Sequence, residues 1–296
     1  MTMLETPPAE VPLNLVKPRR PDRTPNRVGQ VLRYIALGIL ISAVLLPFYW
    51  MVSSSLKMNN DVFTIPVKWY PDTVVWGNYV DIWQKSEMTT WLRNTLLLSV
   101  VVTFLQVLTG SFAAYGFAKV RFPGRDVLFL AYIATIAVPW QSYMIPQFVL
   151  FSKLKLTDTF WSIIALQAFS AFGVFLMKQF YETIPDDLID AARIDGMNEY
   201  GIYRRIMLPL SVPALASLTL LTLVNTWNDY LGPLLYLRSP GLRTIQLGLK
   251  TFVSTYNAEY ALIMTGSVLS VLPIAVIFLL GQRYFVEGIA TTGLKG

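Results

Sequence analysis

The segment that decides the fold is Asn94–Ala118, which reads NTLLLSVVVTFLQVLTGSFAAYGFA. It contains no Asp, Glu, Lys or Arg. A helix that crosses the hydrocarbon core of a bilayer needs about 20 predominantly apolar residues, and this segment supplies them. Helices inside soluble proteins are usually shorter, at about 10 to 14 residues. The segment therefore predicts a transmembrane helix.

Five further uncharged segments of similar length lie along the chain. They are Tyr34–Leu56, Val127–Ser152, Thr159–Met177, Ile206–Asn228 and Tyr260–Gln282. Only 14% of all residues are charged, whereas about 25% are charged in an average soluble domain. The sequence therefore predicts an all-α integral membrane protein with six transmembrane helices.

The distribution of Lys and Arg predicts the topology and the division of the chain. More of them fall on the inner side when both ends of the chain are placed in the cytoplasm, as the cluster Lys119, Arg121 and Arg125 illustrates. The predicted parts are a disordered, basic, Pro-rich cytoplasmic tail (1–30), the first transmembrane helix (31–56), an extracytoplasmic segment (57–93), a core of five helices (94–283) with a long cytoplasmic loop (178–210), and a cytoplasmic C-terminal tail (284–296).

Residue types needed for several kinds of chemistry are missing from the chain. Cysteine and histidine are both absent, so thiolate and imidazole ligands, nucleophiles and bases are excluded, and we expect no metal site and no catalytic site. A Walker A loop needs a glycine-rich turn that ends in Gly-Lys-[Ser/Thr], and Gly248-Leu249-Lys250-Thr251 has the wrong spacing. We expect no cofactor in this chain. The net charge of +6 is not gathered into a basic stripe, so no nucleic acid partner is expected.

Two other classes of membrane protein fit the sequence less well. Secondary transporters usually carry an acid, a base or an ion pair near mid-membrane, and the central parts of the six segments contain none. A membrane-embedded transferase would need catalytic residues near an interface, where Asp229 is a lone candidate.

The long cytoplasmic loop between the fourth and fifth segments has the local chemistry of two short helices. Pro185 and the acids that follow it suit the start of the first helix, and Gly196 suits its end. Arg204 and Arg205 suit the end of the second helix, and Pro209 then fits the first turn of the fifth segment. The loop is net acidic, which favours a soluble docking partner over an anionic membrane surface.

The same loop carries the run Asp190-Ala191-Ala192-Arg193-Ile194-Asp195-Gly196, followed by Ile206-Met207-Leu208-Pro209. This pattern resembles the EAA motif of ABC importer permeases, with Asp190 where the family usually has Glu and Met197 where it usually has Ala. In that family the loop is a coupling helix that sits in a groove of a cytoplasmic ATPase. The resemblance implies ATPase coupling for Asp190, Ala191, Ala192, Asp195, Gly196, Leu208 and Pro209. Leu208 and Pro209 fit the structural entry to the fifth segment better than a direct contact.

Other motifs extend the resemblance over residues 30 to 296. The sequences Asn94-Thr95, Pro139…Ile145-Pro146, Trp227-Asn228-Asp229-Tyr230-Leu231 and Gln282–Gly288 are similar to those of MalG-type carbohydrate permeases. An outer gate or a receptor contact is implied for Trp227, Asn228, Asp229 and Tyr230, although an interfacial aromatic belt would use Trp and Tyr equally well. A contact between the C-terminal tail and the ATPase is implied for Leu294, Lys295 and Gly296.

The resemblance implies the type I permease fold of ABC importers, with both ends of the chain inside, in a multi-pass protein of the bacterial inner membrane. The implied activity is import of sugars or oligosaccharides driven by ATP, with a non-sugar solute such as a glycerol phosphate ester as the alternative cargo. The implied partners are a second homologous permease, two cytoplasmic ABC ATPases that bind ATP and Mg²⁺, an extracytoplasmic solute-binding protein and membrane lipid. This chain itself is not expected to be an enzyme.

Overall fold

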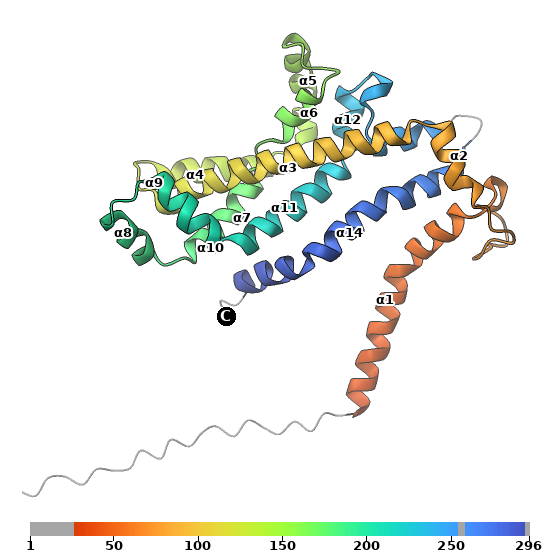
Figure 1. Cartoon of the computed structure of the whole chain (residues 1–296), viewed down its shortest axis with the longest axis horizontal. Coiled ribbons are helices and arrows are strands. Elements are labelled where there is room, and N and C mark those ends of the chain that lie inside the picture. The colour runs from red at the N-terminus through yellow and green to blue at the C-terminus, as the bar shows by residue number, and fades with distance from the viewer. Residues whose placement is uncertain (1–26, 254–257, 294–296) are drawn as a thin grey trace, which may run out of the picture. The chain divides into compact units, whose positions relative to one another are not determined.

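The computed structural model describes residues 27–253 and 258–293, with side chains placed as far as Gln282. These residues form helices joined by loops, and no strand occurs among them (Figure 1). The helices are α1 (Arg27–Ser55), α2 (Gly77–Lys85), α3 (Met88–Lys119), α4 (Arg125–Ala134), α5 (Met144–Lys153), α6 (Phe160–Gln167), α7 (Ala171–Glu182), α8 (Asp186–Ile194), α9 (Glu199–Ile202), α10 (Leu208–Leu210), α11 (Val212–Trp227), α12 (Leu231–Tyr236), α13 (Ile245–Leu249) and α14 (Tyr260–Gly293). Single 3₁₀ turns lie at Asn59–Asp61, Thr135–Ala137, Trp140–Ser142, Pro240–Leu242 and Lys250–Phe252, and a π-helical turn lies at Tyr203–Met207.

The chain divides into two units, residues 1–48 and residues 49–296. In the first unit, the described residues are the N-terminal part of α1, whose large apolar side chains are exposed, as a lipid-facing helix requires. In the second unit α3 is the central helix. It packs along α7 and α11, and α11 packs in turn against α14 (Figure 1).

Four described stretches are long and apolar enough to cross a membrane: Arg27–Ser55, Met88–Lys119, Phe160–Glu182 and Tyr260–Gln282. A fifth is obtained if Glu199–Leu210 and Val212–Trp227, which meet at an angle of 80°, are counted together. The predicted helix over Val127–Ser152 is divided instead into α4 and α5. Pro139 explains the division, because it lacks an N–H and forces Val138 before it into an extended conformation. Six spanning helices therefore remain a prediction.

Several helices extend beyond the uncharged segments that predicted them. Helix α1 begins at Arg27, before the predicted boundary at residue 31, and α3 begins at Met88 rather than at Asn94. Helix α14 continues to Gly293, beyond the predicted boundary at residue 283. A helix does not have to end where the apolar core of the membrane ends. Charged residues in the sequence therefore indicate the limits of the membrane span, but not the limits of the helix. Residues 1–26 of the predicted N-terminal tail lie outside the described residues.

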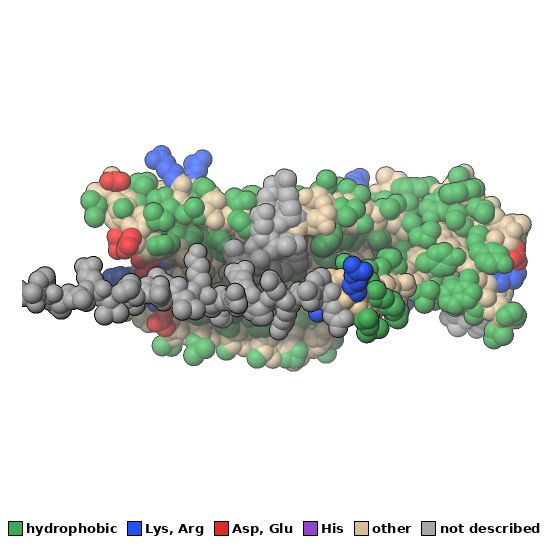
Figure 2. All heavy atoms as spheres, turned by 90° about the horizontal axis from the view of Figure 1, so that it is seen from below, with side chains coloured by type: hydrophobic (Ala, Val, Ile, Leu, Met, Phe, Trp, Pro, Cys, Tyr) green, Lys and Arg blue, Asp and Glu red, His purple; other side chains and the backbone are tan. Residues whose placement is uncertain are grey.

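The surface of the second unit is largely apolar between two charged ends. Figure 2 shows hydrophobic side chains over most of the visible face, with the visible acidic side chains toward the ends. Exposed examples on α3 are Phe104 and Phe112. A soluble monomer rarely exposes so large an apolar area, so this surface is suited to lipid and to partner subunits.

Candidate functional site

Helix α8 forms where the sequence predicts it. Asp186 and Asp187 occupy its first turn and Arg193 its last, which complements the helix dipole at both ends. The helix ends in a Schellman motif: Gly196 adopts a φ of 81°, its N–H donates to the Arg193 carbonyl, and the Met197 N–H donates to the Ala192 carbonyl. The predicted end of the helix at Gly196 is confirmed, and it requires the left-handed conformation that glycine adopts without strain.

Helix α8 has one buried face and one exposed face. Ile189 and Ala192 are buried in an apolar cluster that includes Tyr181 and Met207. Asp190 and Ala191 are exposed on the other side of the helix, and Asp195 and Gly196 are exposed after it. The residues predicted from the EAA-like motif are thus divided, with Ala192 packed inside this chain and four neighbours available to a partner.

Arg193 connects α8 to two other helices. Its Nε donates to Glu199 Oε1 in α9 at 2.9 Å, Nη1 donates to Asp190 Oδ1 at 3.0 Å, and Nη2 donates to the carbonyl of Lys119 at the end of α3 at 3.2 Å. The Glu199 carboxylate also accepts a hydrogen bond from the hydroxyl of Tyr115 in α3. These bonds hold both helices of the loop against α3.

Lys119 fixes the start of α8. Its ammonium group is almost fully buried, and it donates to the Ile184 carbonyl at 2.7 Å and to Asp186 Oδ1 at 2.6 Å. The hydrogen bond from Lys119 lowers the pKa of the Asp186 carboxyl below its ordinary value. The sequence marks Lys119 only as part of an inner-side basic cluster. Its role in positioning the loop, like those of Tyr115 and Glu199, has no signal in the linear pattern.

The second helix of the loop is longer than predicted. Asn198 caps its start, because Oδ1 accepts a hydrogen bond from the Gly201 N–H at 2.8 Å. The prediction that Arg204 and Arg205 end this helix is wrong, since the helix continues through them to Leu210. The π-helical turn at Tyr203–Met207 explains how, because its wider spacing relieves the clash of the Pro209 ring with the preceding turn.

The chain bends by 80° at Ser211, between the loop helix and α11. Ser211 is fully buried, and its hydroxyl donates to the Met207 carbonyl at 2.8 Å. Pro209 is exposed before the bend, and Pro213 rather than Pro209 occupies the first turn of α11. Leu208 and Pro209 therefore belong to the loop helix and not to α11.

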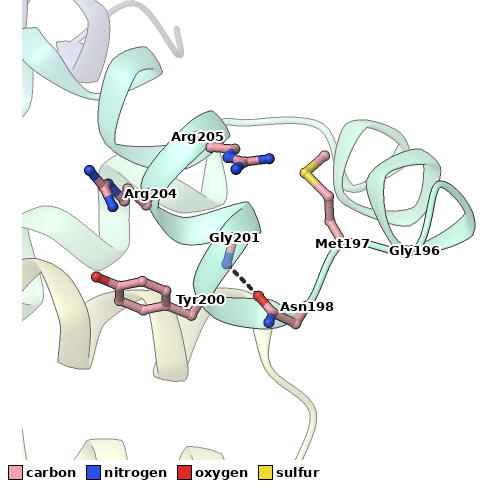
Figure 3. Close-up of a pocket in the computed structure, with 7 residues that line it drawn as sticks. All are labelled: Gly196, Met197, Asn198, Tyr200, Gly201, Arg204 and Arg205. Carbon is pink, nitrogen blue, oxygen red and sulfur yellow. Dashed lines mark hydrogen bonds between the residues drawn. The ribbon is translucent and has the colours of Figure 1, made fainter.

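A hollow of about 370 Å³ lies between the end of α8 and the start of the second helix. Its lining is drawn in Figure 3 and consists of Gly196, Met197, Asn198, Tyr200, Gly201, Arg204 and Arg205. Arg205 extends toward Met197, while Arg204 points to the opposite side of the helix (Figure 3). The hollow can receive a protruding side chain, with an apolar thioether on one wall and a guanidinium group on another.

The four residues predicted for an outer gate do not share one surface. Trp227 is buried and its indole N–H donates to the Ser270 carbonyl at 3.1 Å, whereas Asn228 is exposed. Asp229 turns inward and accepts a hydrogen bond from the Gln167 amide at 2.6 Å, and the Tyr230 ring lies near the Lys250 ammonium group. Leu294, Lys295 and Gly296, predicted to contact the ATPase, lie outside the described residues.

Residues 106–290 match a protein family described as the inner membrane component of binding-protein-dependent transport systems. This range includes the whole of loop 178–210. The chain belongs to this family. It is therefore a membrane component of an ABC transport system, and its apolar helices are consistent with a multi-pass arrangement.

Individual members of this permease family are similar over nearly their whole length. The arabinooligosaccharides transport system permease protein AraQ of Halalkalibacterium halodurans is 35% identical, with 90% of this chain and 93% of that protein covered. The sn-glycerol-3-phosphate transport system permease protein UgpE of Pectobacterium atrosepticum is 30% identical, with 89% and 97% covered. Among solved structures, the chain is similar to one chain in the crystal structure of a bacterial ABC transporter involved in the import of the acidic polysaccharide alginate. The TM-score is 0.77 and the sequence identity is 25%, and the match covers 88% of this chain and 97% of that chain.

Proposed function

We propose that this chain is the permease subunit of an ATP-driven importer of sugars or oligosaccharides, and that loop 178–210 couples it to the ATPase. The observation that carries the proposal is the division of α8 into two faces. One face is held in this chain by buried side chains and by Lys119 and Arg193, while the other exposes Asp190 and Ala191 without covering them.

The proposed topology has six membrane spans with both ends of the chain in the cytoplasm of a bacterium. Loop 178–210 then lies on the cytoplasmic side, where an ATPase is available. Trp227–Tyr230 follow the fifth span toward the outer side, where Asn228 is exposed and is the best placed of the four for a gate or a receptor contact. The C-terminal Leu294, Lys295 and Gly296 would reach the same ATPase.

The proposed assembly contains a second homologous permease, two cytoplasmic ATPases and an extracytoplasmic solute-binding protein. ATP and Mg²⁺ bind to the ATPases, and this chain carries out no bond chemistry. When the ATPases close, they move α8, and the hydrogen bonds of Lys119 and Arg193 pass this movement to α3. The two permeases then change from inward-facing to outward-facing, and the solute passes between them.

Gly196 provides a test that separates backbone conformation from surface contact. Asn adopts the left-handed conformation more readily than other non-glycine residues, so Gly196→Asn keeps the end of α8 while adding a side chain. A Cβ at this position would meet no described atom of this chain within 4 Å, so the added side chain begins in open space on the face proposed for the partner. We expect Gly196→Asn and Gly196→Trp both to uncouple uptake from ATP hydrolysis while the complex stays assembled in the membrane.

The measurement is solute uptake per ATP hydrolysed in proteoliposomes that contain the whole complex, with the binding protein supplied outside. Gly124 is the matched control, because it has a φ of 79° in another exposed turn and a Cβ there also meets no described atom within 4 Å. Normal coupling in both Gly196 variants, together with the absence of a crosslink from Asp190→Cys to an ATPase, would disprove the proposal.

The cargo is tested in the same preparation. We expect an arabinose oligosaccharide presented with the binding protein to stimulate ATP hydrolysis. The similarity to a glycerol-3-phosphate permease makes sn-glycerol 3-phosphate the competing solute. Stimulation by the phosphate ester alone would replace the proposed sugar cargo and leave the ATPase coupling in place.

A further inference from the structure

The stretch Phe160–Glu182, which is long and apolar enough to cross a membrane, is interrupted near its middle, between α6 and α7. The interruption frees carbonyl groups that water cannot reach in a bilayer, so other groups of the protein must satisfy them. Helix α3 does so: Gln106 Nε2 donates to the Gln167 carbonyl at 2.7 Å, and Thr109 Oγ1 donates to the Ala168 carbonyl at 2.8 Å. Interrupted helices of this kind occur where a polar cavity or a ligand lies beside them.

A polar cavity of about 350 Å³ does lie beside the interruption. It lies between α3, the junction of α6 and α7, and one face of α11. The polar side chains that line it and matter for its chemistry are Gln106, Gln167, Thr222, Asn225, Thr226 and Asp229. The polar positions on α11 follow the spacing of a single helical face, and Phe172 and Leu221 complete the lining.

Most of these groups hold one another in fixed orientations. Thr222 Oγ1 donates to Gln106 Oε1 at 2.7 Å, and Thr226 Oγ1 donates to Gln167 Oε1 at 3.0 Å. Gln167 Nε2 donates to Asp229 Oδ2 at 2.6 Å, and Asp229 Oδ1 accepts from the Gly232 N–H at 3.1 Å. The orientations of the Gln106 and Gln167 amides are therefore set before any solute arrives.

Asn225 differs from the other groups in the cavity. Its side chain is exposed, and it makes no hydrogen bond among the described residues. An amide in this position offers two N–H donors and one carbonyl acceptor to a molecule in the cavity. It is the group most available for contact with a solute.

The charge of the cavity limits which solutes suit it. Asp229 is the one ionisable side chain among the described residues that line it. A carboxylate accepts hydrogen bonds from hydroxyl groups and repels phosphates and carboxylates. The mixture of amide, hydroxyl and carboxylate groups thus matches a neutral polyhydroxyl molecule.

We propose that this cavity is a solute-contacting site that this chain contributes to the transport path, and that it takes neutral polyhydroxyl solutes in preference to anions. The inference rests on the proposed function, because it places the cavity on a path shared with a second permease. It adds a role for Asn225 and Asp229 and a reason why a sugar fits better than a phosphate ester.

The experiment uses the absence of cysteine from this chain. Asn225→Cys places a single thiol in the cavity of this subunit within the assembled complex in membrane vesicles. Labelling of this chain is followed with a cationic and an anionic methanethiosulfonate reagent of similar size. We expect the ratio of the cationic to the anionic labelling rate to be about tenfold higher than the same ratio for a free thiol in solution, because a single-sign cleft concentrates the opposite charge. In the double variant with Asp229→Asn this ratio should fall to that of the free thiol.

Protection of the Asn225→Cys thiol from labelling then identifies the solute that enters the cavity. Arabinotriose should slow the labelling of Asn225→Cys, and sn-glycerol 3-phosphate should not. Phe104→Cys is the control, since Phe104 is exposed on the apolar surface of α3 and does not line the cavity. Both reagents should label it slowly, because a thiol in lipid is not ionised.

The proposal is overturned if Asn225→Cys is no more reactive than Phe104→Cys, if its ratio of cationic to anionic labelling rate equals that of a free thiol, or if glycerol 3-phosphate protects as well as arabinotriose. A cavity filled by a side chain of the partner permease would produce the first of these results. ATP hydrolysis stimulated by the binding protein is measured in the same vesicles. If it is normal while the labelling fails, the cavity proposal alone is wrong, and if it is absent, the proposed coupling is wrong.

Discussion

Arg193 of α8 and Glu199 of α9 are joined by a hydrogen bond of 2.9 Å from Nε to Oε1, across the turn that contains Gly196. The pair closes the loop on itself, and the same guanidinium reaches the end of α3 through the Lys119 carbonyl. Two helices that would otherwise move independently about a glycine turn are thereby held together and to a spanning helix.

The first prediction concerns this pair. Glu199→Ala removes the acceptor of both Arg193 and Tyr115. Because the side chains of the pair are 33% and 46% exposed, we expect a double-mutant cycle with Arg193→Ala to give a coupling energy of only about 0.5 to 1 kcal/mol. The effect on transport should be larger, with ATP hydrolysis retained and uptake reduced. The cycle is measured by thermal unfolding of the purified complex, and a coupling energy near zero would argue that the pair does not hold the loop.

The second prediction compares Lys119 with its partner. Lys119→Met removes the donor to the Ile184 carbonyl and to Asp186. We expect the free energy of unfolding to fall by about 1.5 to 3 kcal/mol, which is typical of hydrogen bonds to charged groups. Asp186→Asn should cost less, because Asp186 is 69% exposed and the bond to Ile184 remains. Limited proteolysis of loop 178–210 reports the difference. Equal protection of the loop in both variants would contradict the role given to Lys119.

The third prediction concerns Asn94 at the opposite end of α3. Its buried amide donates to the carbonyls of Gly241 and Arg243 at 2.9 and 3.0 Å. Asn94→Leu leaves two carbonyls without donors, so we expect a loss of about 2 kcal/mol or more in the free energy of unfolding. Asn228→Ala is the control, because Asn228 is exposed and its amide bonds only to the Val224 carbonyl and, at 3.4 Å, to Gln246. It should change stability by less than about 0.5 kcal/mol.

The fourth prediction concerns a close approach between α13 and α3. A Cβ at Gly248 would overlap the indole ring of Trp91, which is itself buried. We expect Gly248→Ala to destabilise the protein by about 1 to 3 kcal/mol, as overpacking usually does. Gly116→Ala in α3 should be neutral or slightly stabilising, since a Cβ there meets no described atom within 4 Å and alanine favours helix. A melting temperature equal for the two variants would show that Trp91 can move aside.

The sequence predicts features that depend on neighbouring residues. The helix Asp186–Ile194 and its end at Gly196 follow from acids at one end, a base at the other and glycine at the turn. Contacts between distant segments have no such signature. Lys119 is separated from Asp186 by 67 positions and Gln167 from Asp229 by 62, and only the fold brings them together.

Two predictions from the sequence differ from the structure at a proline, because the sequence does not show how the surrounding backbone accommodates the ring. The uncharged segment Val127–Ser152 predicts one helix, and Pro139 divides it into α4 and α5. Pro209 was expected to open α11, and a π-helical turn accommodates it before the bend at Ser211. Asp229 is the remaining case: its hydrogen bond to Gln167 joins it to the stretch Phe160–Glu182, a contact that the sequence does not predict.

The bend at Ser211 makes α11 a lever arm. The loop helix and α11 meet at 80°, so rotation of the loop helix about its own axis becomes a sideways displacement of the far end of α11. Helix α11 has 16 residues. At about 1.5 Å per residue the arm is about 24 Å long, and a rotation of about 10° would move its Trp227 end by about 4 Å. Asp229 lies just beyond that end, so we expect a small turn of loop 178–210 to draw Asp229 away from Gln167.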